Sequence, residues 1–388
     1  MWIKDQEMNK SIRPTETDHN FWFGKRVLIT GGDGFVAANL ANELIQRSAN
    51  VVVVVRHQRP INTMKLLGIS DVVPDIEYSD LSSFVNVQKL CNRHQIDTVF
   101  HLAASAIVSD ASNAPISTFE NNIIPTLNIL ETARINRIPR VLIASSDKSY
   151  GDHADLADPE RIPYKENYGL RGLDVYSASK VCADMISQTY AFQFKLPVII
   201  VRSCNIYGPG DLNFTRLIPR TILRLMLNYR PVINEGNASV LREYIFIDDL
   251  VTAYLFLAEH VTHHYQEEMP QRGRATYGWA AYNVGSYMSQ SSSRLEDCSN
   301  IRSVVQVIDQ AKSKLGKNNI ESVVIPKDVN FIEIPDQYLD SSKIVELGFQ
   351  TKITFDEGLD KAIEWYQTNK TYLVKLGYKH LEDSLSRS

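Results

Sequence analysis

The chain has 388 residues, of which 44% are hydrophobic and 22% charged, and its formal net charge is −4. This composition is typical of a globular enzyme that is long enough for a large α/β domain and a smaller second lobe. The near-neutral charge provides no electrostatic footprint for nucleic acid or an anionic membrane, and no apolar run approaches the length needed to span a bilayer.

The N-terminal segment, 1–20, is polar and has no apolar signal core, so we expect a flexible tail and a cytoplasmic protein. The four cysteines are scattered without disulfide or metal spacing and are predicted to be free thiols. His263 and His264 lack further ligands at a suitable spacing, so a solvated loop is favoured there and no metal site is predicted.

The first predicted strand, Lys25–Thr30, is a short apolar run that enters a glycine-rich turn and is followed by a helix over Val36–Arg47. This order is the context that a dinucleotide-binding glycine motif requires, with the pyrophosphate at the helix N-terminus. Ala37 stands where a third glycine is usual, which is a mild departure because that position needs only a small residue. The cofactor contacts predicted here are Gly31, Gly34, Phe35 and Val36.

A second buried strand is predicted over Val51–Val55. The next position usually carries an acid for the ribose 2′-hydroxyl of NAD, but here it is Arg56, and a cation suits the 2′-phosphate of NADP. The residues therefore lean towards NADP, although Arg56 can equally stack on the adenine. Asp80 and Leu81 follow a third strand, predicted over Ile76–Ser79, and the Asp80 carboxylate either meets the adenine amino group or is an ordinary surface group.

A fourth strand is predicted over Thr98–Ala104 and ends in small residues that let a cofactor lie against the backbone. Within it, His101 is expected to be a hydrogen-bonded core histidine and not a ligand. The cofactor contacts predicted on this strand are Leu102, Ala103 and Ala104.

The most informative pattern is Tyr176-Ser-Ala-Ser-Lys180, which starts 146 residues after Thr30. A tyrosine and a lysine four residues apart share one face of a helix, where the ammonium can lower the phenol pKa from about 10 towards neutrality. Alone, the pattern fits a solvated helix face equally well. Behind a strand and a glycine turn, it predicts that Tyr176 is a catalytic base and that Lys180 is its partner beside the dinucleotide.

Further motifs follow in a fixed order from Phe21 to about Tyr366. They are Phe21-Trp-Phe-Gly-Lys-Arg26, the glycine turn, His101-Leu-Ala-Ala104, Ser145-Ser-Asp-Lys-Ser-Tyr-Gly151, Tyr176-Ser-Ala-Ser-Lys180, Arg202-Ser-Cys-Asn-Ile-Tyr-Gly-Pro209, Arg242-Glu-Tyr-Ile-Phe-Ile-Asp248 and Asp340-Ser-Ser-Lys343. Together they resemble the extended short-chain dehydrogenase/reductases, and specifically the nucleotide-sugar 4,6-dehydratases. The resemblance implies a Rossmann-like, doubly wound parallel sheet over 21–205 that binds NAD or NADP. It also implies a smaller C-terminal substrate lobe, mainly 206–388 and interleaved with the sheet.

The segment Ser145–Gly151 follows a predicted strand over Arg140–Ala144, where open parallel sheets place their ligands. Dehydratases of the family carry a hydroxyl residue, then Asp, then usually Glu, whereas the 4-epimerases carry no acid/base pair there. The Asp-Lys variant resembles CDP-glucose 4,6-dehydratase, whereas Arg242–Asp249 is nearer the general epimerase/dehydratase form. The alternative to a catalytic pair is a solvated loop. The three residues here are Ser146, Asp147 and Lys148.

The resemblance implies conversion of a nucleotide-activated hexose, with CDP-glucose favoured, to its 4-keto-6-deoxy derivative. Tyr176 would take the 4-hydroxyl proton, with Ser146 on the 4-oxygen, while C4 gives a hydride to the tightly bound cofactor. Lys148 would then remove the C5 proton, and Asp147 would protonate the leaving 6-hydroxyl. A lysine base must lose its proton first, so Lys148 stabilising only the enolate stays open. The substrate contacts implied are Ser105, Asn205, Arg216 and Arg242.

Two other functions stay open: a nucleotide-sugar 4-epimerase or 4-reductase of the same fold, and, more remotely, a non-catalytic NAD(P)-sensing protein. In the C-terminal half, helices are predicted over 217–229, 248–260, 304–315 and 356–366, with a strand over 244–247. The stretch His263–Asn300 is polar and rich in Gly, Gln and Ser, so it is expected to contain a long loop.

Two helices carry more apolar residues than one core-facing stripe requires. One is predicted over Asn122–Arg134, and the other begins near Tyr176. Core packing is the simpler interpretation. The resemblance implies that both helices also form the four-helix seam of a homodimer.

Overall fold

A computed structural model describes residues 21–57, 59–153, 162–267, 278–286, 300–326 and 334–376 of the protein. Its largest element is a seven-stranded sheet. The strand order is β10-β6-β5-β4-β1-β2-β3, and every neighbouring pair is parallel. Such a sheet needs crossover helices on its faces, so the predicted Rossmann-like, doubly wound fold is confirmed. The strands are β1 (Arg26–Thr30), β2 (Asn50–Val55), β3 (Asp75–Tyr78), β4 (Thr98–His101), β5 (Arg140–Ala144), β6 (Val198–Ser203) and β10 (Ala281–Val284).

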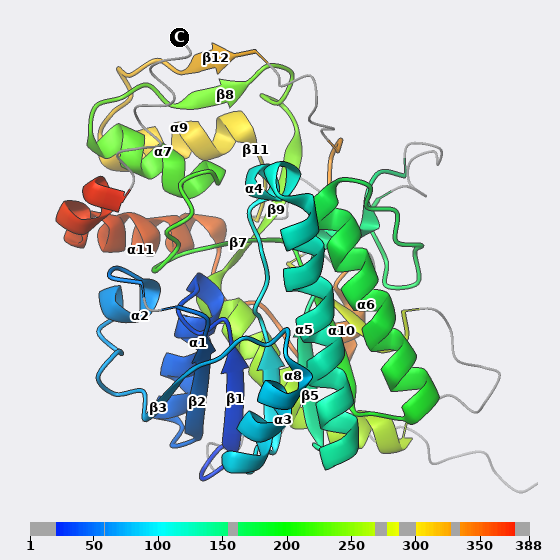
Figure 1. The fold of residues 1–388 in the computed structure, drawn as a ribbon. Coiled ribbons are helices and arrows are strands. Elements are labelled where there is room, and N and C mark those ends of the chain that lie inside the picture. Colours follow the sequence, from blue (N-terminus) through cyan, green and yellow to red (C-terminus); the bar gives the residue numbers. More distant parts are fainter. Residues whose placement is uncertain are drawn as a thin grey trace, which may run out of the picture.

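Helices cover both faces of this sheet, which explains why its strands are continuous apolar runs. In β2, each of Val51–Val55 is at most 4% exposed. α3, α5 and α6 pack side by side, and α5 and α6 run nearly in parallel in Figure 1, whereas α1 packs on α8. The bounds are α1 (Phe35–Gln46), α3 (Phe84–Arg93), α5 (Pro115–Asn136), α6 (Val175–Phe194) and α8 (Ile247–Glu267).

Short elements of the C-terminal half gather at one end of the sheet (Figure 1). Two small sheets, β11-β9-β7 and β12-β8, lie there with α7, α9 and α11. Their bounds are β7 (Asn205–Tyr207), β8 (Val232–Asn234), β9 (Leu241–Phe246), β11 (Ile301–Ser303), β12 (Val323–Ile325), α7 (Leu217–Met226), α9 (Val304–Leu315) and α11 (Phe355–Thr368). The remaining short helices are α2 (Thr63–Leu66), α4 (Val108–Asn113), α10 (Ser342–Glu346) and the 3₁₀ helix η1 (Asp147–Tyr150).

The stretch His263–Asn300, which was expected to contain a long loop, also contains parts of two regular elements that were not predicted. α8 continues to Glu267, and Ala281–Val284 form β10, the edge strand of the main sheet beside β6. β10 escaped prediction because it is short and contains Asn283, which is fully buried and donates to the carbonyls of Tyr164 and Asp340. Residues 268–277 and 287–299 of that stretch, which include Cys298, and the tail 1–20 lie outside the described residues, as do the side chains of His263 and His264.

Candidate active site

Three glycines pack the turn after β1 against the neighbouring strands. Gly31 has φ +71°, and a Cβ there would lie 2.9 Å from the Cα of Ala103. A Cβ on Gly32 would lie 1.6 Å from Cγ1 of Val53, and one on Gly34 would lie 3.1 Å from the Gly31 carbonyl oxygen. Gly34 is also the N-cap of α1. The three glycine positions therefore have no room for a Cβ without a shift of their neighbours, and the turn leaves backbone N–H groups at a helix N-terminus, which fits a dinucleotide pyrophosphate. The sequence analysis missed the role of Gly32.

A hydrogen-bonded pair joins the ends of β1 and β4 beneath this turn. The Thr30 hydroxyl accepts hydrogen bonds from the backbone N–H groups of Leu102 and Ala103, each at 3.0 Å, and lies 2.8 Å from Nδ1 of His101. Nε2 of His101 lies 3.1 Å from the Thr126 hydroxyl. Burial, reinforced by the charge of Lys180, lowers the pKa of His101 to about 3. His101 is therefore a neutral core histidine, as predicted, and it fixes the chain that continues through Leu102, Ala103 and Ala104.

The arginines after β2 are already engaged with polar groups. The Arg56 guanidinium donates to Oδ1 of Asn121 at 2.8 Å, and that of Arg59 lies 3.1 Å from the carboxylate of Asp33 in the glycine turn. Asp80 is exposed and accepts a hydrogen bond from the Ser82 backbone N–H at 2.9 Å, while Leu81 is buried. Arg56 and Asp80 therefore lie just after the carboxyl ends of β2 and β3, as the sequence analysis predicted.

Tyr176 lies in the first turn of α6, whose N-cap, Asp174, accepts from the Ser177 backbone N–H at 3.0 Å. The phenol is 9% exposed. Burial raises its pKa, while a hydrogen bond with Ser146 and the positive charge of Arg216 oppose that rise. The sequence analysis expected Lys180 to lower the pKa of Tyr176, and this expectation is wrong, because burial raises it.

Lys180 lies one helical turn after Tyr176 and is almost fully buried. Its ammonium donates to the backbone carbonyl of Ala144, at the end of β5, over 2.8 Å. Burial lowers the pKa of Lys180 to about 8, and the carboxylate of Asp184 opposes that shift. Lys180 therefore ties α6 to the end of β5, and burial disfavours the charged form of its amine.

Asp147 and Lys148 form an ion pair at the end of β5. Ser146 is the N-cap of η1 and donates to Oδ1 of Asp147 at 3.1 Å. The Lys148 ammonium lies 2.9 Å from Oδ2 of Asp147. Asp147 is only 2% exposed, so the alternative of a solvated loop pair is excluded for this carboxylate. Through Ser146, the pair connects directly to the phenol of Tyr176.

A residue of the C-terminal half, missed by the sequence analysis, completes this cluster. The side-chain oxygen of Gln337 accepts from the Lys148 ammonium at 2.8 Å, and its side-chain nitrogen donates to the Asp147 backbone carbonyl at 2.9 Å. Gln337 is 1% exposed. It lies 189 residues from Lys148 in the chain, and no local pattern marks it.

A buried ion pair supports the segment from behind. Arg202 of β6 and Asp184 of α6 are both fully buried and make two hydrogen bonds of 2.9 Å. Asp184 also accepts from the Ser145 hydroxyl at 2.7 Å, and Arg202 donates to the Tyr150 hydroxyl at 3.0 Å. The Tyr150 hydroxyl in turn donates to Asn283 of β10 at 2.7 Å. Residues on both sides of the Asp147–Lys148 pair are thereby fixed to α6, β6 and β10.

The predicted substrate contacts fall at two places. Arg216, the N-cap of α7, lies close enough to Tyr176 to influence its pKa and pairs with the buried Asp211 at 3.0 Å. The backbone N–H of Ser105 donates to Asn122 of α5 at 2.7 Å, and Asn122 donates to the hydroxyl of Ser179, next to Lys180, at 2.8 Å. Asn122 therefore connects Ser105 to α6 by hydrogen bonds.

Asn205 and Arg242 lie in the small sheet of the C-terminal lobe. The Asn205 side chain donates to the Glu243 backbone carbonyl at 3.0 Å. The Arg242 guanidinium donates to the carbonyls of Pro335 and Ile334, at 2.9 and 2.6 Å, and also to its neighbour Leu241. Arg242 therefore fastens the 334–340 segment, which carries Gln337, to β9.

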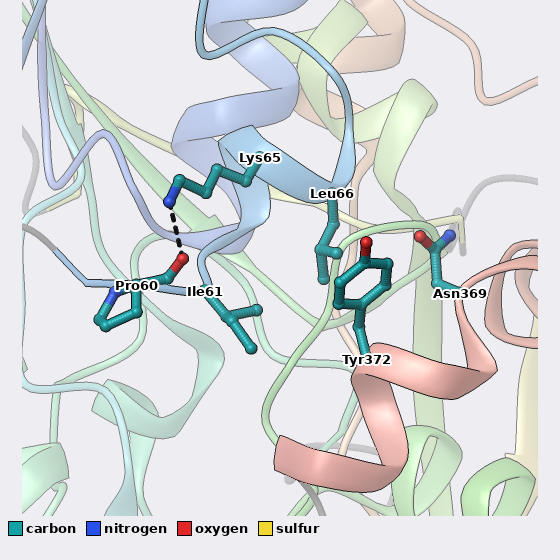
Figure 2. A pocket seen from close by; sticks show the side chains of 6 residues that line it. All are labelled: Pro60, Ile61, Lys65, Leu66, Asn369 and Tyr372. Carbon is teal, nitrogen blue, oxygen red and sulfur yellow. Dashed lines mark hydrogen bonds between the residues drawn. The ribbon is translucent and has the colours of Figure 1, made fainter.

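A separate hollow of about 430 Å³ lies between the segment after β2 and the C-terminal helical turn. Figure 2 shows Leu66 beside Tyr372, and Lys65 reaching the Pro60 carbonyl at 2.8 Å. None of the predicted catalytic or substrate residues lines this hollow. Within the described ranges, no group of three or more His, Cys, Asp or Glu side chains is arranged to hold a metal ion. Nor does any helix of the described chain combine the length and apolar character needed to cross a membrane.

A glycine turn, a tyrosine–lysine helix and polar groups at the ends of parallel strands together define a dinucleotide-dependent class of Rossmann proteins. Residues 27–270 match the model of the NAD dependent epimerase/dehydratase family. The chain belongs to this family, and its resemblance to the extended short-chain dehydrogenase/reductases is confirmed.

Curated relatives with sequence similarity carry dehydratase names. A trifunctional UDP-glucose 4,6-dehydratase/UDP-4-keto-6-deoxy-D-glucose 3,5-epimerase/UDP-4-keto-L-rhamnose-reductase of Arabidopsis thaliana is 28% identical over 349 residues, which cover 89% of this chain and 48% of the relative. The chain thus spans about half the length of the first curated relatives it matches. The dTDP-D-glucose 4,6-dehydratase of Homo sapiens is 27% identical over 357 residues, covering 89% of this chain and 91% of the relative.

Solved structures show the same fold. The dTDP-glucose 4,6-dehydratase DesIV of Streptomyces venezuelae, with NAD bound, superposes with a TM-score of 0.74 at 21% identity, covering 90% of this chain and 99% of that chain. A UDP-glucose 4-epimerase from Thermotoga maritima gives a TM-score of 0.72 at 21% identity, covering 89% of this chain and 99% of that chain. Because a dehydratase and an epimerase superpose about equally well, the fold alone does not choose between the two reactions.

Proposed function

We propose that this protein is an NAD(P)-dependent nucleotide-sugar 4,6-dehydratase. The observation that carries the proposal is the buried Asp147, paired with Lys148 at 2.9 Å and joined through Ser146 to Tyr176. A 4-epimerase needs proton transfer at O4 only, whereas elimination across C5 and C6 also needs a base and an acid. The dehydratase names of several relatives support the same choice.

The cofactor proposed is NAD, held at the glycine turn and along Leu102, Ala103 and Ala104, with NADP as the alternative favoured by Arg56. The turn fits a pyrophosphate because no Cβ is tolerated at Gly31, whereas Arg56 is engaged with Asn121. A bound nicotinamide ring supplies hydride acceptance from C4 and hydride return to C6, so the reaction is redox-neutral.

Each catalytic side chain has a distinct role in the proposal. Tyr176 takes the proton of the sugar 4-hydroxyl while Ser146 hydrogen-bonds the 4-oxygen. Because burial raises the pKa of Tyr176, ionisation depends on nearby positive charge, of which Arg216 provides part. Once C4 is a ketone, Lys148 either takes the C5 proton or stabilises the enolate that forms when this proton leaves, and Asp147 protonates the departing 6-hydroxyl, which leaves as water. Lys180 holds the cofactor ribose and the end of β5.

The substrate proposed is a nucleoside diphosphate glucose. The Asp-Lys variant favours CDP-glucose, whereas the printed names of the relatives mention UDP-glucose and dTDP-glucose. We propose Arg242 and Arg216 as contacts of the diphosphate, with Ser105 and Asn205 on the sugar side. Screening CDP-, UDP-, GDP- and dTDP-hexoses by thermal shift and product mass identifies the nucleotide.

Separating the two halves of the reaction tests the proposal. Asp147→Asn leaves Tyr176 and Lys180 in place but removes the acid for the 6-hydroxyl. Oxidation at C4 should therefore continue, and reduced nicotinamide should accumulate, visible by its near-ultraviolet absorbance. Formation of the 4-keto-6-deoxy sugar should fall by about 10²–10⁴-fold, the usual contribution of a positioned acid. The control, Tyr176→Phe, should show neither absorbance nor product. Near-normal 6-deoxy product from Asp147→Asn would instead favour the 4-epimerase interpretation and remove the acid role.

We also propose a homodimer formed by α5 and α6 of two copies. Both helices leave large apolar side chains exposed, including Ile116 at 74%, Phe192 at 52% and Phe194 at 47%. Such a surface is costly in water, and a second copy would cover it. Phe192→Glu should shift the protein from dimer to monomer in light scattering after size exclusion. A monomeric unmodified protein would refute the seam.

A further inference from the structure

Gln337 connects the C-terminal lobe to the pair that the proposed function uses for elimination. Its side-chain oxygen and nitrogen contact Lys148 and Asp147, at 2.8 and 2.9 Å respectively. Each end of the amide therefore makes a hydrogen bond to one residue of the pair, and Gln337 is 1% exposed. A buried amide that is bonded at both ends favours one geometry, because rotating it away leaves buried polar groups unpaired.

The backbone that carries Gln337 is fixed equally well. Its N–H donates to the carbonyl of Leu241 in β9 at 3.1 Å, and Gln337 bridges to Arg242 as a parallel neighbour. The adjoining Asp336 carboxylate accepts from the Leu241 N–H at 2.8 Å, and the Leu339 N–H donates to the buried Glu243 at 2.9 Å. The backbone on both sides of the Gln337 amide is thus hydrogen-bonded to β9.

The Lys148 side chain requires a second hydrogen-bond partner to hold its ammonium in one position. Its side chain is 26% exposed, and a lysine has four rotatable bonds, so the ion pair with Asp147 alone leaves it several positions. Asp147 and Gln337 together occupy two of the three N–H directions of Nζ. The third remains for the sugar. An amide also accepts this bond without adding a second negative charge beside the buried carboxylate.

We infer that Gln337 is the positioning residue of the Asp147–Lys148 pair, supplied by the C-terminal lobe to orient the Lys148 amine towards C5 of the sugar. The inference rests on the proposed 4,6-dehydratase function and deepens it. Gln337 does not touch the reacting atoms; it acts through Lys148. The elimination half of the reaction therefore depends on this contact from the lobe, whereas the oxidation half does not use Gln337.

Gln337→Met tests the inference because methionine has a similar length but offers no amide. The kcat for the 6-deoxy product should fall about tenfold to a hundredfold, with KM unchanged, and reduced nicotinamide should accumulate during turnover. In a Lys148→Met background the same change should add little, because the residue acts through the lysine. Gln310→Met is the matched control, since Gln310 hydrogen-bonds Asp356 at the surface. A fully additive loss, or a rise in KM without accumulation of reduced cofactor, would overturn the inference.

A second measurement does not depend on the reaction. Competitive acetylation read by mass spectrometry reports the freedom of each lysine amine. In Gln337→Met, Lys148 should label faster relative to the exposed Lys89, whereas in Gln310→Met the ratio should stay at the wild-type value. Unchanged labelling of Lys148 would refute its positioning by Gln337 even in an active dehydratase. A wild-type protein that forms no 4-keto-6-deoxy sugar from any of the four nucleotide hexoses would instead refute the proposed function.

Discussion

The buried charge of Lys180 is expected to destabilise the folded protein at neutral pH. Burial lowers its pKa from 10.5 to about 8. This difference corresponds to roughly 3 kcal/mol, because each pKa unit is about 1.36 kcal/mol of differential interaction between the two protonation states. At neutral pH the free energy of unfolding is therefore lowered by the buried charge of Lys180 on α6. Replacing Lys180 with methionine removes that charge.

The sign follows from proton linkage. Below the folded pKa of about 8, the lysine is charged in both the folded and unfolded chains, and the burial cost is fully present. As pH rises through that value, the folded chain releases the proton while the unfolded chain keeps it up to about 10.4, so stability increases. Between roughly pH 7 and 9.5, the linkage integral gives a gain of about 2 kcal/mol for the wild-type protein. Lys180→Met lacks this gain.

Urea unfolding followed by circular dichroism at both pH values, with matched cofactor content, measures the effect. The quantity to compare is the wild-type minus variant difference in free energy of unfolding, because other groups titrate in both proteins. Burial raises the pKa of the Cys91 thiol to about 12, for example, and this destabilises both proteins equally as pH rises. Lys89→Met, an exposed substitution on α3, serves as the control. A difference that stays constant between the two pH values would show that the Lys180 charge is not penalised by burial, and the reasoning would fail.

Three further predictions concern the cofactor, the substrate and the scaffold. Arg56→Asp should weaken NADP binding far more than NAD binding if the guanidinium meets a 2′-phosphate, and calorimetric titration showing equal effects would make it structural. Arg242→Ala should raise KM for the nucleotide sugar by about 1.5–3 kcal/mol in binding, and an unchanged KM would remove it from the diphosphate site. Asp184→Asn should cost about 3–5 kcal/mol in urea unfolding because it leaves Arg202 buried without its charge partner, whereas a cost below that of an exposed substitution would refute the role of the pair.

Local patterns were sufficient to predict most of the main sheet. β1, β2 and β5 are short apolar runs bounded by polar or turn residues, and β5 was predicted over its observed bounds, Arg140–Ala144. Burial on both faces of a parallel sheet imposes that pattern directly on the sequence. β10 broke it, because Asn283 is buried where a strand normally carries an apolar residue, and its amide is satisfied by Tyr164 and Asp340. Only the folded chain brings those carbonyls within reach.

The residues proposed to be catalytic divide in the same way. Tyr176 with Lys180, and Asp147 with Lys148, are pairs close in sequence, so helix geometry and strand ends predicted their positions. Gln337 was not predictable, because its contacts depend on how the C-terminal lobe docks on β5. The direction of the pKa shift of Tyr176 was not predictable either. Burial raises this pKa by more than the Ser146 hydrogen bond and the Arg216 charge lower it, and burial depends on the packing of the whole site.

The opposing pKa effects at Tyr176 and Lys180 suggest how the site is tuned. Burial raises the pKa of the tyrosine and lowers that of the lysine to about 8. At neutral pH the phenol therefore keeps its proton, whereas Lys180 is still largely charged, and the Asp184 carboxylate helps to hold that charge. In the proposed reaction, proton abstraction from the sugar requires positive charge beside the phenol, and Arg216 at the N-cap of α7 is placed to contribute. The proposed base therefore depends on a cation from the C-terminal half as well as on its own helix.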